Sequence, residues 1–311
     1  MNIFYELPQQ KICHNSILSI GNFDGVHKGH KYLLEKCVKQ AQEKKIPSVV
    51  FSFYNNPALF INNVGSYYIT LPEEKIDLIK NLNVEICCFP IFDEKIMKIS
   101  PEIFMEKIQF YFNPSKIIVG QNFNFGYKRE GDYNSLQSFF GLDRVDVIKP
   151  VEYESERISS TRIRKLIYDG EVELAEKLLG YNFFIEGIVS EGNKIGAQLG
   201  IPTLNIHTEK SGKIVPKPGV YVTKTLLDGV LFDSITNIGG APTLNFEDRN
   251  KIETHIFDNN LQKMYNKKIK IIFLKFLRDE VKFENVEMLK NTMLSDIIKA
   301  KKIISGDEGE K

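Results

Sequence analysis

Residues 16–31, SILSIGNFDGVHKGHK, decide the fold of the first half of the chain. The apolar run SILSI is typical of a buried strand, and the residues from Gly29 onward favour a helix. Glycines at positions 21, 25 and 29 punctuate the turn between them and let the backbone approach a ligand closely. A strand that leads directly into a helix indicates a parallel α/β sheet, which binds ligands along the carboxyl ends of its strands.

This turn holds two of the chain's five histidines, His27 and His30. The start of the helix presents backbone N–H groups and the positive end of the helix dipole to an anion. Histidine side chains at that place can donate to charge that develops on a phosphate. A plainer interpretation is that one histidine caps the helix and the other packs. The predicted nucleotide contacts of the turn are Gly21, Phe23, Gly25, His27, Gly29 and His30.

Length, charge and cysteine content narrow the possible classes of protein. A chain of 311 residues exceeds the usual size of one core, so two domains are expected. The 41 Lys and Arg nearly balance the 40 Asp and Glu, which gives no overall attraction to nucleic acid or to an anionic membrane. The 4 cysteines form no CxxC pair, so a disulfide framework or a zinc site is not expected. Without a leader pattern or a long apolar segment, the chain is expected to be cytoplasmic.

Strand-like and helix-like segments alternate up to about residue 150. The predicted strands are 16–20, 48–53, 85–89, 116–120 and 145–150, and the predicted helices between them are 29–44, 73–81 and 101–112. This alternation predicts a parallel, Rossmann-like α/β sheet that is covered on both faces. Two further helices are expected at 159–170 and 171–180.

After Gly180 the sequence becomes rich in strand-forming residues with glycine and proline turns. The predicted strands are 183–190, 219–227, 230–239, 251–258 and 267–276, followed by a helix at 286–300. The pattern predicts a small antiparallel β-barrel with a terminal helix. We therefore expect domains at 1–181 and 182–304 and a disordered tail at 305–311.

Three segments of the first half carry a resemblance. HxGH between a strand and a helix resembles the signature of the nucleotidyltransferase superfamily, whose members transfer the AMP moiety of ATP with release of pyrophosphate. ISSTRIR (158–164) resembles its second ATP motif, although its hydroxyl residues are also good helix N-caps. The loop VGQNFNFGYKREGD (119–132) matches the form G-x-[DN]-F-x-F-G of the bacterial bifunctional riboflavin kinase/FMN adenylyltransferase family. The resemblance implies ATP contacts at Ser159, Ser160, Thr161 and Arg162 or Arg164, with Arg164 preferred, and FMN contacts at Asn122 and Phe125.

The second half resembles the riboflavin kinase part of the same family. GNKIGAQLGIPTLNI (192–206) is similar to its G-x-x-LG-F-PT-x-N segment, and KIETHIFD (251–258) to its ETH segment. The resemblance implies that Glu253 is the general base and that Thr203 and Asn205 help to hold Mg²⁺ and ATP phosphates, which suits a metal that prefers hard oxygen ligands. Strand alternation places Glu253 and His255 on one face and Thr254 on the other. The other implied ATP and flavin contacts are Gly192, Lys194, Gly200, Pro202 and Arg278. Where many relatives have an arginine this chain has Ala197, and Lys194 is the predicted substitute.

The resemblance implies that riboflavin and MgATP give FMN, and that FMN and a second ATP give FAD and pyrophosphate. The histidine turn alone also fits transfer to another phosphate acceptor. The barrel alone also fits a flavin-storage module or, less well, a nucleic-acid-binding module. The expected partners are small molecules only, with neither nucleic acid nor membrane, and the expected state is a monomer or weak homo-oligomer.

Overall fold

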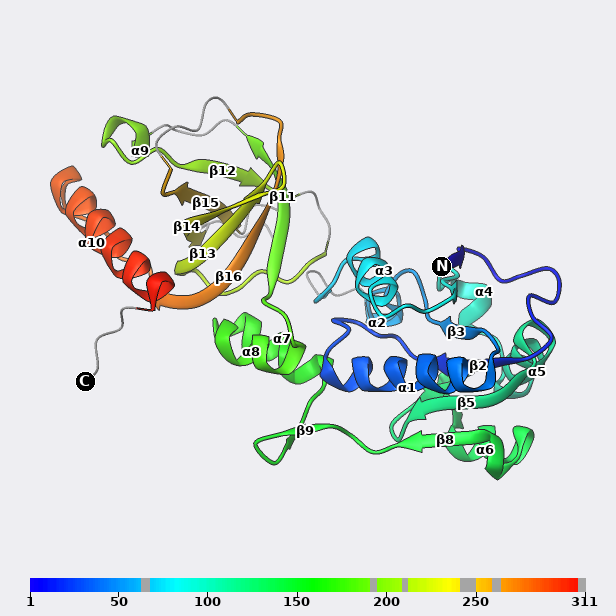
Figure 1. Ribbon diagram of the computed structural model, residues 1–311. Coiled ribbons are helices and arrows are strands. Elements are labelled where there is room, and N and C mark those ends of the chain that lie inside the picture. The colour runs from blue at the N-terminus through cyan, green and yellow to red at the C-terminus, as the bar shows by residue number, and fades with distance from the viewer. Residues whose placement is uncertain (63–67, 191–194, 209–211, 241–249, 259–263, 307–311) are drawn as a thin grey trace. The chain divides into compact units, whose positions relative to one another are not determined.

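The computed structural model describes residues 1–62, 68–190, 195–208, 212–240, 250–258 and 264–306 (Figure 1). The chain divides into two compact units, Met1–Arg162 and Ile163–Lys311, and each is described by itself. The predicted boundary between residues 181 and 182 lies further along the chain and stays a prediction. No helix among the described residues is long and apolar enough to cross a membrane.

The first unit is built on a six-stranded sheet in the order β1-β4-β3-β2-β5-β8, in which every pairing is parallel. The strands are β1 (Asn2–Phe4), β2 (Ser16–Ile20), β3 (Ser48–Phe51), β4 (Ile86–Cys88), β5 (Pro114–Gly120) and β8 (Val145–Ile148). All residues of β2, β3 and β4 are buried, as expected of a sheet covered on both faces. The predicted parallel α/β fold is confirmed, and β1 is an additional edge strand.

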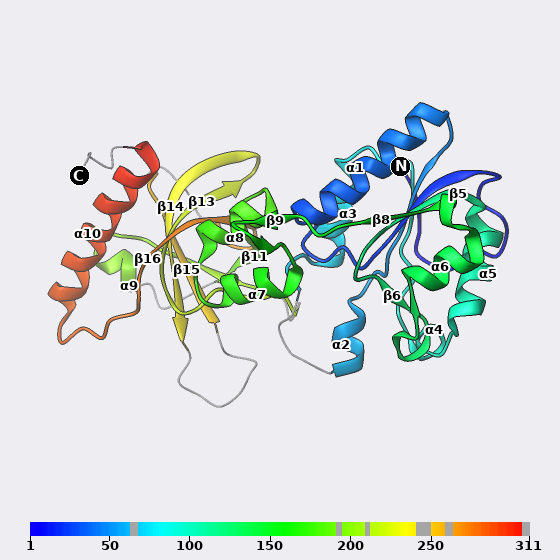
Figure 2. The ribbon, with the colours of Figure 1, turned by 90° about the horizontal axis from the view of Figure 1, so that it is seen from below.

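Helices cover both faces of this sheet (Figure 2). They are α1 (Lys28–Lys44), α2 (Pro57–Asn62), α3 (Pro72–Lys80), α4 (Glu94–Met97), α5 (Pro101–Phe112) and α6 (Tyr133–Phe140). The apolar stripe of α5 and α6 packs on the face that carries Leu18 and Val49, and α1 and α3 pack on the opposite face around Val50. Short 3₁₀ turns and two-stranded ribbons complete the unit: η1 (Tyr127–Arg129), η2 (Leu142–Arg144), β6 (Asn124–Phe125) with β7 (Gly131–Asp132), and β9 (Glu152–Tyr153) with β10 (Glu156–Arg157).

The second unit is a closed six-stranded barrel in the order β11-β12-β15-β14-β13-β16, and all of its pairings are antiparallel. Its strands are β11 (Phe184–Ser190), β12 (Leu204–His207), β13 (Gly219–Leu227), β14 (Val230–Gly240), β15 (Asn250–Ile256) and β16 (Lys268–Arg278). Its helices are α7 (Ser160–Tyr168), which spans the division between the units, α8 (Val172–Leu179), α9 (Ile195–Gln198) and α10 (Val286–Ser305). The predicted barrel with a terminal helix is confirmed. The helix extends to Ser305, five residues beyond its predicted end, and residues 307–311 of the predicted tail lie outside the described residues.

Five hydroxyl side chains, all fully buried, form a continuous ladder inside the barrel. Thr225 bonds to Ser234 (2.9 Å), Ser234 to Thr223 (2.8 Å), Thr223 to Thr236 (2.9 Å), and Thr236 to Thr254 (2.8 Å). Thr254 then donates to the carbonyl oxygen of Ile235 at 3.2 Å. The ladder fixes Thr254 on the inner face of β15, so the residues on either side of it face outward.

Candidate active sites

The histidine turn lies at the carboxyl edge of the parallel sheet, between β2 and α1. His27 is the N-cap of α1: its Nδ1 accepts from the backbone N–H of His30 at 3.2 Å. The two imidazole rings stack with centroids 3.6 Å apart and an angle of 16° between their planes. Because Nδ1 of His27 accepts a hydrogen bond, the proton of the neutral ring is on Nε2, the nitrogen that can donate to an anion. Capping and phosphate stabilisation are therefore compatible roles for this residue.

The turn has an unusual backbone that its neighbours hold in place. Phe23, Gly25 and Val26 all have positive φ, of 51°, 81° and 33°. The Asp24 carboxylate accepts from the backbone N–H groups of Ile69 and Thr70, both at 3.2 Å. The N–H of Gly25 donates to the Thr70 hydroxyl at 2.9 Å. Phe23 was predicted as a nucleotide contact. Its side chain is in the core and only 1% exposed, so only its backbone is available for such a contact.

The second predicted ATP motif meets this turn. The hydroxyl of Ser160, the first residue of α7, donates to the carbonyl of Asp24 at 3.0 Å, and the Ser159 hydroxyl caps the helix by accepting from the N–H of Arg162 at 3.2 Å. The guanidinium of Arg162 is engaged by the β9–β10 ribbon through an ion pair of 3.0 Å with Glu156. Thr161 is exposed, and Arg164 follows on the same helix within the second unit. The structure thus joins two motifs that lie more than 120 residues apart in the sequence.

The aromatic loop after β5 contains two predicted site residues, Asn122, which makes a polar contact, and Phe125, which packs in the core. The Asn122 side-chain oxygen, in its hydrogen-bonding orientation, accepts from the guanidinium of Arg157 on β10. Phe125 was predicted as an FMN contact but is 8% exposed, stacks on Phe123 and lies in the core beside Phe104. We therefore assign it to packing. Arg157 was missed by the sequence analysis, although it directly precedes the ISSTRIR segment.

A group of aromatic side chains also lies near this edge of the sheet, after β3 and β4. Phe53 and Phe60 both contact Phe92, with ring centroids 5.0 and 5.7 Å apart, and Phe60 is 46% exposed. We call Phe53, Phe60 and Phe92 the aromatic patch. Asn56, in the same segment as Phe53 and Phe60, donates to Asp24 at 3.4 Å and so connects the patch to the histidine turn.

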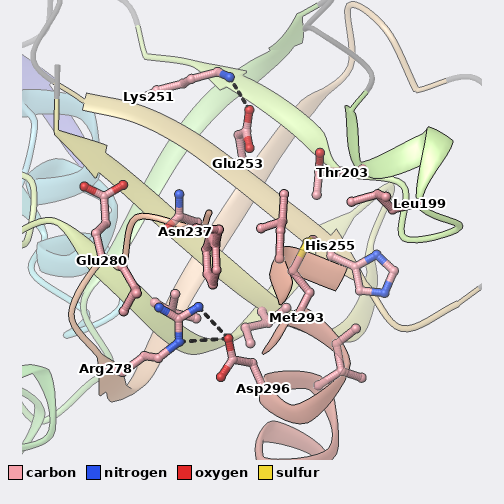
Figure 3. A pocket seen from close by; sticks show the side chains of 17 residues that line it. Leu199, Thr203, Asn237, Lys251, Glu253, His255, Arg278, Glu280, Met293 and Asp296 are labelled. Atoms are coloured by element: carbon pink, nitrogen blue, oxygen red, sulfur yellow. Dashed lines mark hydrogen bonds and ion pairs between the residues drawn. The ribbon is translucent and has the colours of Figure 1, made fainter. Parts of the chain in front are cut away.

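The second unit has a pocket of about 270 Å³ on the outer face of the barrel, closed on one side by α10 (Figure 3). Its lining includes Thr203, Asn237, Glu253, His255 and Arg278. In the strand register Glu253 is opposite Asn205 on one side and Asn237 on the other. The row Asn205–Glu253–Asn237 therefore crosses three neighbouring strands. The prediction that Glu253 and His255 share a face opposite Thr254 is confirmed, because both line the pocket and Thr254 is inside the barrel.

Two ion pairs lie in the lining of this pocket, as the dashed lines in Figure 3 show. Lys251 pairs with the Glu253 carboxylate, whose side chain is 26% exposed. Arg278 donates through Nε and Nη2 to one oxygen of the buried Asp296 on α10, at 2.9 and 2.7 Å. Lys251 was missed by the sequence analysis, although it is two residues before Glu253 and therefore on the same face of β15.

The remaining predicted kinase residues surround the segment before β12. The carbonyl of Pro202 accepts from His255 Nδ1 at 2.7 Å, and burial lowers the pKa of that imidazole. Gly200 has a φ of 80° and is exposed. Gly192 and Lys194 lie outside the described residues, so the predicted substitution of Lys194 for the arginine stays a prediction. Within the described ranges no group of three or more His, Cys, Asp or Glu side chains could hold a metal ion.

Comparisons with known proteins identify both halves of the chain. A family model for FAD synthetase matches residues 9–162, and one for riboflavin kinase matches residues 179–304. A bifunctional riboflavin kinase/FMN adenylyltransferase from Buchnera aphidicola (strain Sg) is 36% identical over 94% of this chain and 95% of its own. A protein of the same name from Bacillus subtilis is 32% identical over 90% of each chain. A crystal structure from Streptococcus pneumoniae, described as a macrolide-efflux protein, is 28% identical with a TM-score of 0.85 and covers 96% of this chain and 98% of its own.

Proposed function

The chain belongs to the bifunctional riboflavin kinase/FMN adenylyltransferase family, which makes FMN from riboflavin and FAD from FMN, and we propose which of its residues carry each step. The barrel unit phosphorylates riboflavin, and the α/β unit adenylylates FMN. The observation that carries the first assignment is the row Asn205–Glu253–Asn237, of which Glu253 and Asn237 line the pocket. The observation that carries the second is the stacked pair His27 and His30, with Ser160 bonded to the same turn.

In the barrel, Glu253 accepts the proton of the ribityl 5′-hydroxyl while that oxygen attacks the γ-phosphorus of ATP. The new P–O bond forms FMN, and the bond to the β-phosphate oxygen breaks to release ADP. Lys251 orients the Glu253 carboxylate through their ion pair before the hydroxyl arrives. Glu253 is flanked by the side-chain amides of Asn205 and Asn237, which are neutral hydrogen-bonding groups. Glu253 is therefore the only carboxylate in that row.

The residues before and on β12 fit a magnesium ion bound with ATP. Thr203 lines the pocket, and Asn205 is opposite Glu253, so a hydroxyl and an amide oxygen are near the proposed base. Both are hard oxygen ligands of the kind Mg²⁺ prefers, and phosphate oxygens and water would complete its shell. When bound, the ion supplies positive charge that offsets the charge of the phosphates.

In the α/β unit, an FMN phosphate oxygen attacks the α-phosphorus of ATP, and the bond to the β-phosphate oxygen breaks to release pyrophosphate. His27 and His30 donate to the charge that develops on the phosphates, and no covalent enzyme intermediate is needed. The hydroxyls of Ser159 and Thr161 and the N-terminus of α7 hold the triphosphate, with Arg164 as a further charge partner. The Ser160 hydroxyl, which donates to the Asp24 carbonyl, ties this N-terminus to the histidine turn.

Arg157 and the aromatic patch complete the proposed acceptor site. Arg157 is held by Asn122 at the end of the loop after β5, where its guanidinium can bind a phosphate oxygen. The flavin ring of FMN stacks on the patch through Phe60, whose exposed aromatic side chain favours a flat apolar ligand. We also propose that the chain acts in the cytoplasm as a monomer or weak homo-oligomer and does not bind nucleic acid, in keeping with its net charge of +1.

The test follows riboflavin, FMN and FAD by chromatography in the full chain with ATP and Mg²⁺. Glu253→Gln should lower the rate of FMN formation by about 10² to 10⁴-fold and leave conversion of added FMN to FAD unchanged. His30→Ala should lower FAD formation by about 10² to 10³-fold and leave FMN formation unchanged. The matched controls are Glu284→Gln and His14→Ala, both at exposed positions. FAD formation within a few-fold of wild type in His30→Ala would contradict the role of the histidine turn, and flavin binding without any product would indicate a storage module.

A further inference from the structure

A lysine that belongs to none of the motifs lies beneath the carboxyl edge of the parallel sheet. Lys75 on α3 is 4% exposed. Its ammonium group is 3.5 Å from the carbonyl oxygen of Asn22 and 3.5 Å from the hydroxyl of Ser52, and it also donates to the carbonyl of Phe53. The face of the Phe89 ring lies 5.7 Å away. All three oxygens belong to residues within two positions of the ends of β2 and β3.

The number of acceptors matches the chemistry of a protonated lysine. An ammonium group has three N–H donors, and three oxygens converge on this one. All three acceptors are neutral, and among the described residues no carboxylate lies within ion-pair distance of Lys75. Burying such a charge is costly, and a methionine or leucine would fill the same space without that cost. A packing role therefore does not account for a lysine at this position.

The two segments that Lys75 joins are the ones proposed to hold the two substrates. Asn22 belongs to the histidine turn, which is proposed to bind ATP, and Phe53 belongs to the aromatic patch, which is proposed to bind FMN. Ser52 donates to the same Asn22 carbonyl at 3.0 Å, so the ammonium group closes a three-membered network between the two strand ends. Deprotonation removes one of the three N–H donors of Lys75, and replacement by methionine removes all three, so the bond from Ser52 to Asn22 is left without the ammonium group that joins it to Phe53.

We propose that Lys75 is a positioning residue for adenylyl transfer, which fixes the histidine turn relative to the aromatic patch so that the acceptor phosphate meets the α-phosphorus in line. The inference rests on the proposed function of the α/β unit. Small displacements of reacting groups cost rate more than affinity, because each substrate keeps its own contacts. The effect should therefore appear in kcat rather than in KM.

The test compares Lys75→Met with Lys80→Met, an exposed lysine on the same helix, in the full chain. For Lys75→Met we expect kcat for conversion of FMN to FAD to fall roughly 100-fold, with KM for ATP and for FMN changed less than about threefold. Riboflavin phosphorylation, measured on the same preparation, should stay within about twofold. Lys80→Met should match wild type in both reactions.

A pH profile separates positioning from a structural role. Burial lowers the pKa of Lys75 to about 8, and Asp24 is the charged group that opposes this shift. FAD formation by wild type should therefore decline above about pH 8, while FMN formation does not. In Lys75→Met the decline should be absent.

Three outcomes decide the matter. A wild-type chain that makes FMN but never converts FMN to FAD refutes the proposed function itself. A Lys75→Met variant with near wild-type kcat, or one that retains the alkaline decline, refutes the role of Lys75 alone. Circular dichroism shows whether Lys75→Met folds. If it does not, the pH profile of the wild-type chain is the test. A wild-type profile in which FAD formation does not decline above about pH 8, or declines together with FMN formation, overturns the inference.

Discussion

The α/β unit should become more stable between neutral and alkaline pH because of one side chain. Burial lowers the pKa of Lys75 from 10.5 in the unfolded chain to about 8 in the fold. Between these two values the unfolded state binds more protons than the folded state, so the free energy of unfolding rises with pH. The full difference of 2.5 pKa units corresponds to about 3 kcal/mol at about 1.4 kcal/mol per unit, of which about 2 kcal/mol is gained by pH 9.5.

The assay is urea unfolding of wild type and Lys75→Met at pH 7 and at pH 9.5. Other groups titrate over this range, but they do so in both proteins, so the difference between the two pH-induced changes isolates Lys75. Wild type should gain about 2 kcal/mol more than the variant, equivalent to a relative rise in Tm of roughly 4–8 °C for a unit of this size. If the free energy of unfolding changed with pH by the same amount in both proteins, or rose more in the variant, the reasoning that Lys75 is charged at neutral pH and buried at a cost would be refuted.

Three further predictions concern stability and use urea unfolding. Gly25→Ala should cost about 1–2 kcal/mol, because the φ of 81° is unfavourable for any residue with a Cβ. Thr236→Val should cost about 1–3 kcal/mol, because it removes the partner of two buried hydroxyls, and Thr225→Val, at the end of the ladder, should cost less; equal costs would contradict the ladder. Asp296→Asn should cost about 2 kcal/mol by weakening two charge-assisted bonds from Arg278, and an unchanged urea midpoint would exclude that contribution.

The two folds could be predicted because each has a strong pattern in the sequence. Runs such as SILSI and SVVF are mainly apolar and buried along their whole length, as in a parallel sheet covered on both faces. The barrel strands alternate between inner and outer faces. The strand β1 was missed because it has only three residues, all partly or fully exposed. The strand β12 was missed because LNIH has one fully buried residue, and only its pairing with β11 and β15 makes it a strand.

The site residues that were missed depend on contacts between distant segments. Arg157 is next to a recognised motif, but its contact with Asn122 joins strand β10 to the loop after β5, 35 residues earlier in the chain. Lys75 follows Glu73 and Glu74, and three charged residues in succession normally indicate an exposed helix face. Its burial follows from the two loops that fold over α3, which no local pattern reports. Phe125 was placed in the site because its motif is shared, whereas its side chain serves the core.

The hydroxyl ladder inside the barrel has a polarity. Its last member, Thr254, donates to a carbonyl oxygen, which can only accept, so Thr254 must accept from Thr236. The same reasoning passes along the chain, and each hydroxyl proton points toward Ile235. Each of the five hydroxyl groups could rotate to several orientations on its own. One backbone carbonyl at the end of the ladder fixes the direction of all five hydroxyl protons. The barrel interior therefore carries an ordered line of dipoles, whose direction would be visible as deuterium positions in a neutron diffraction map.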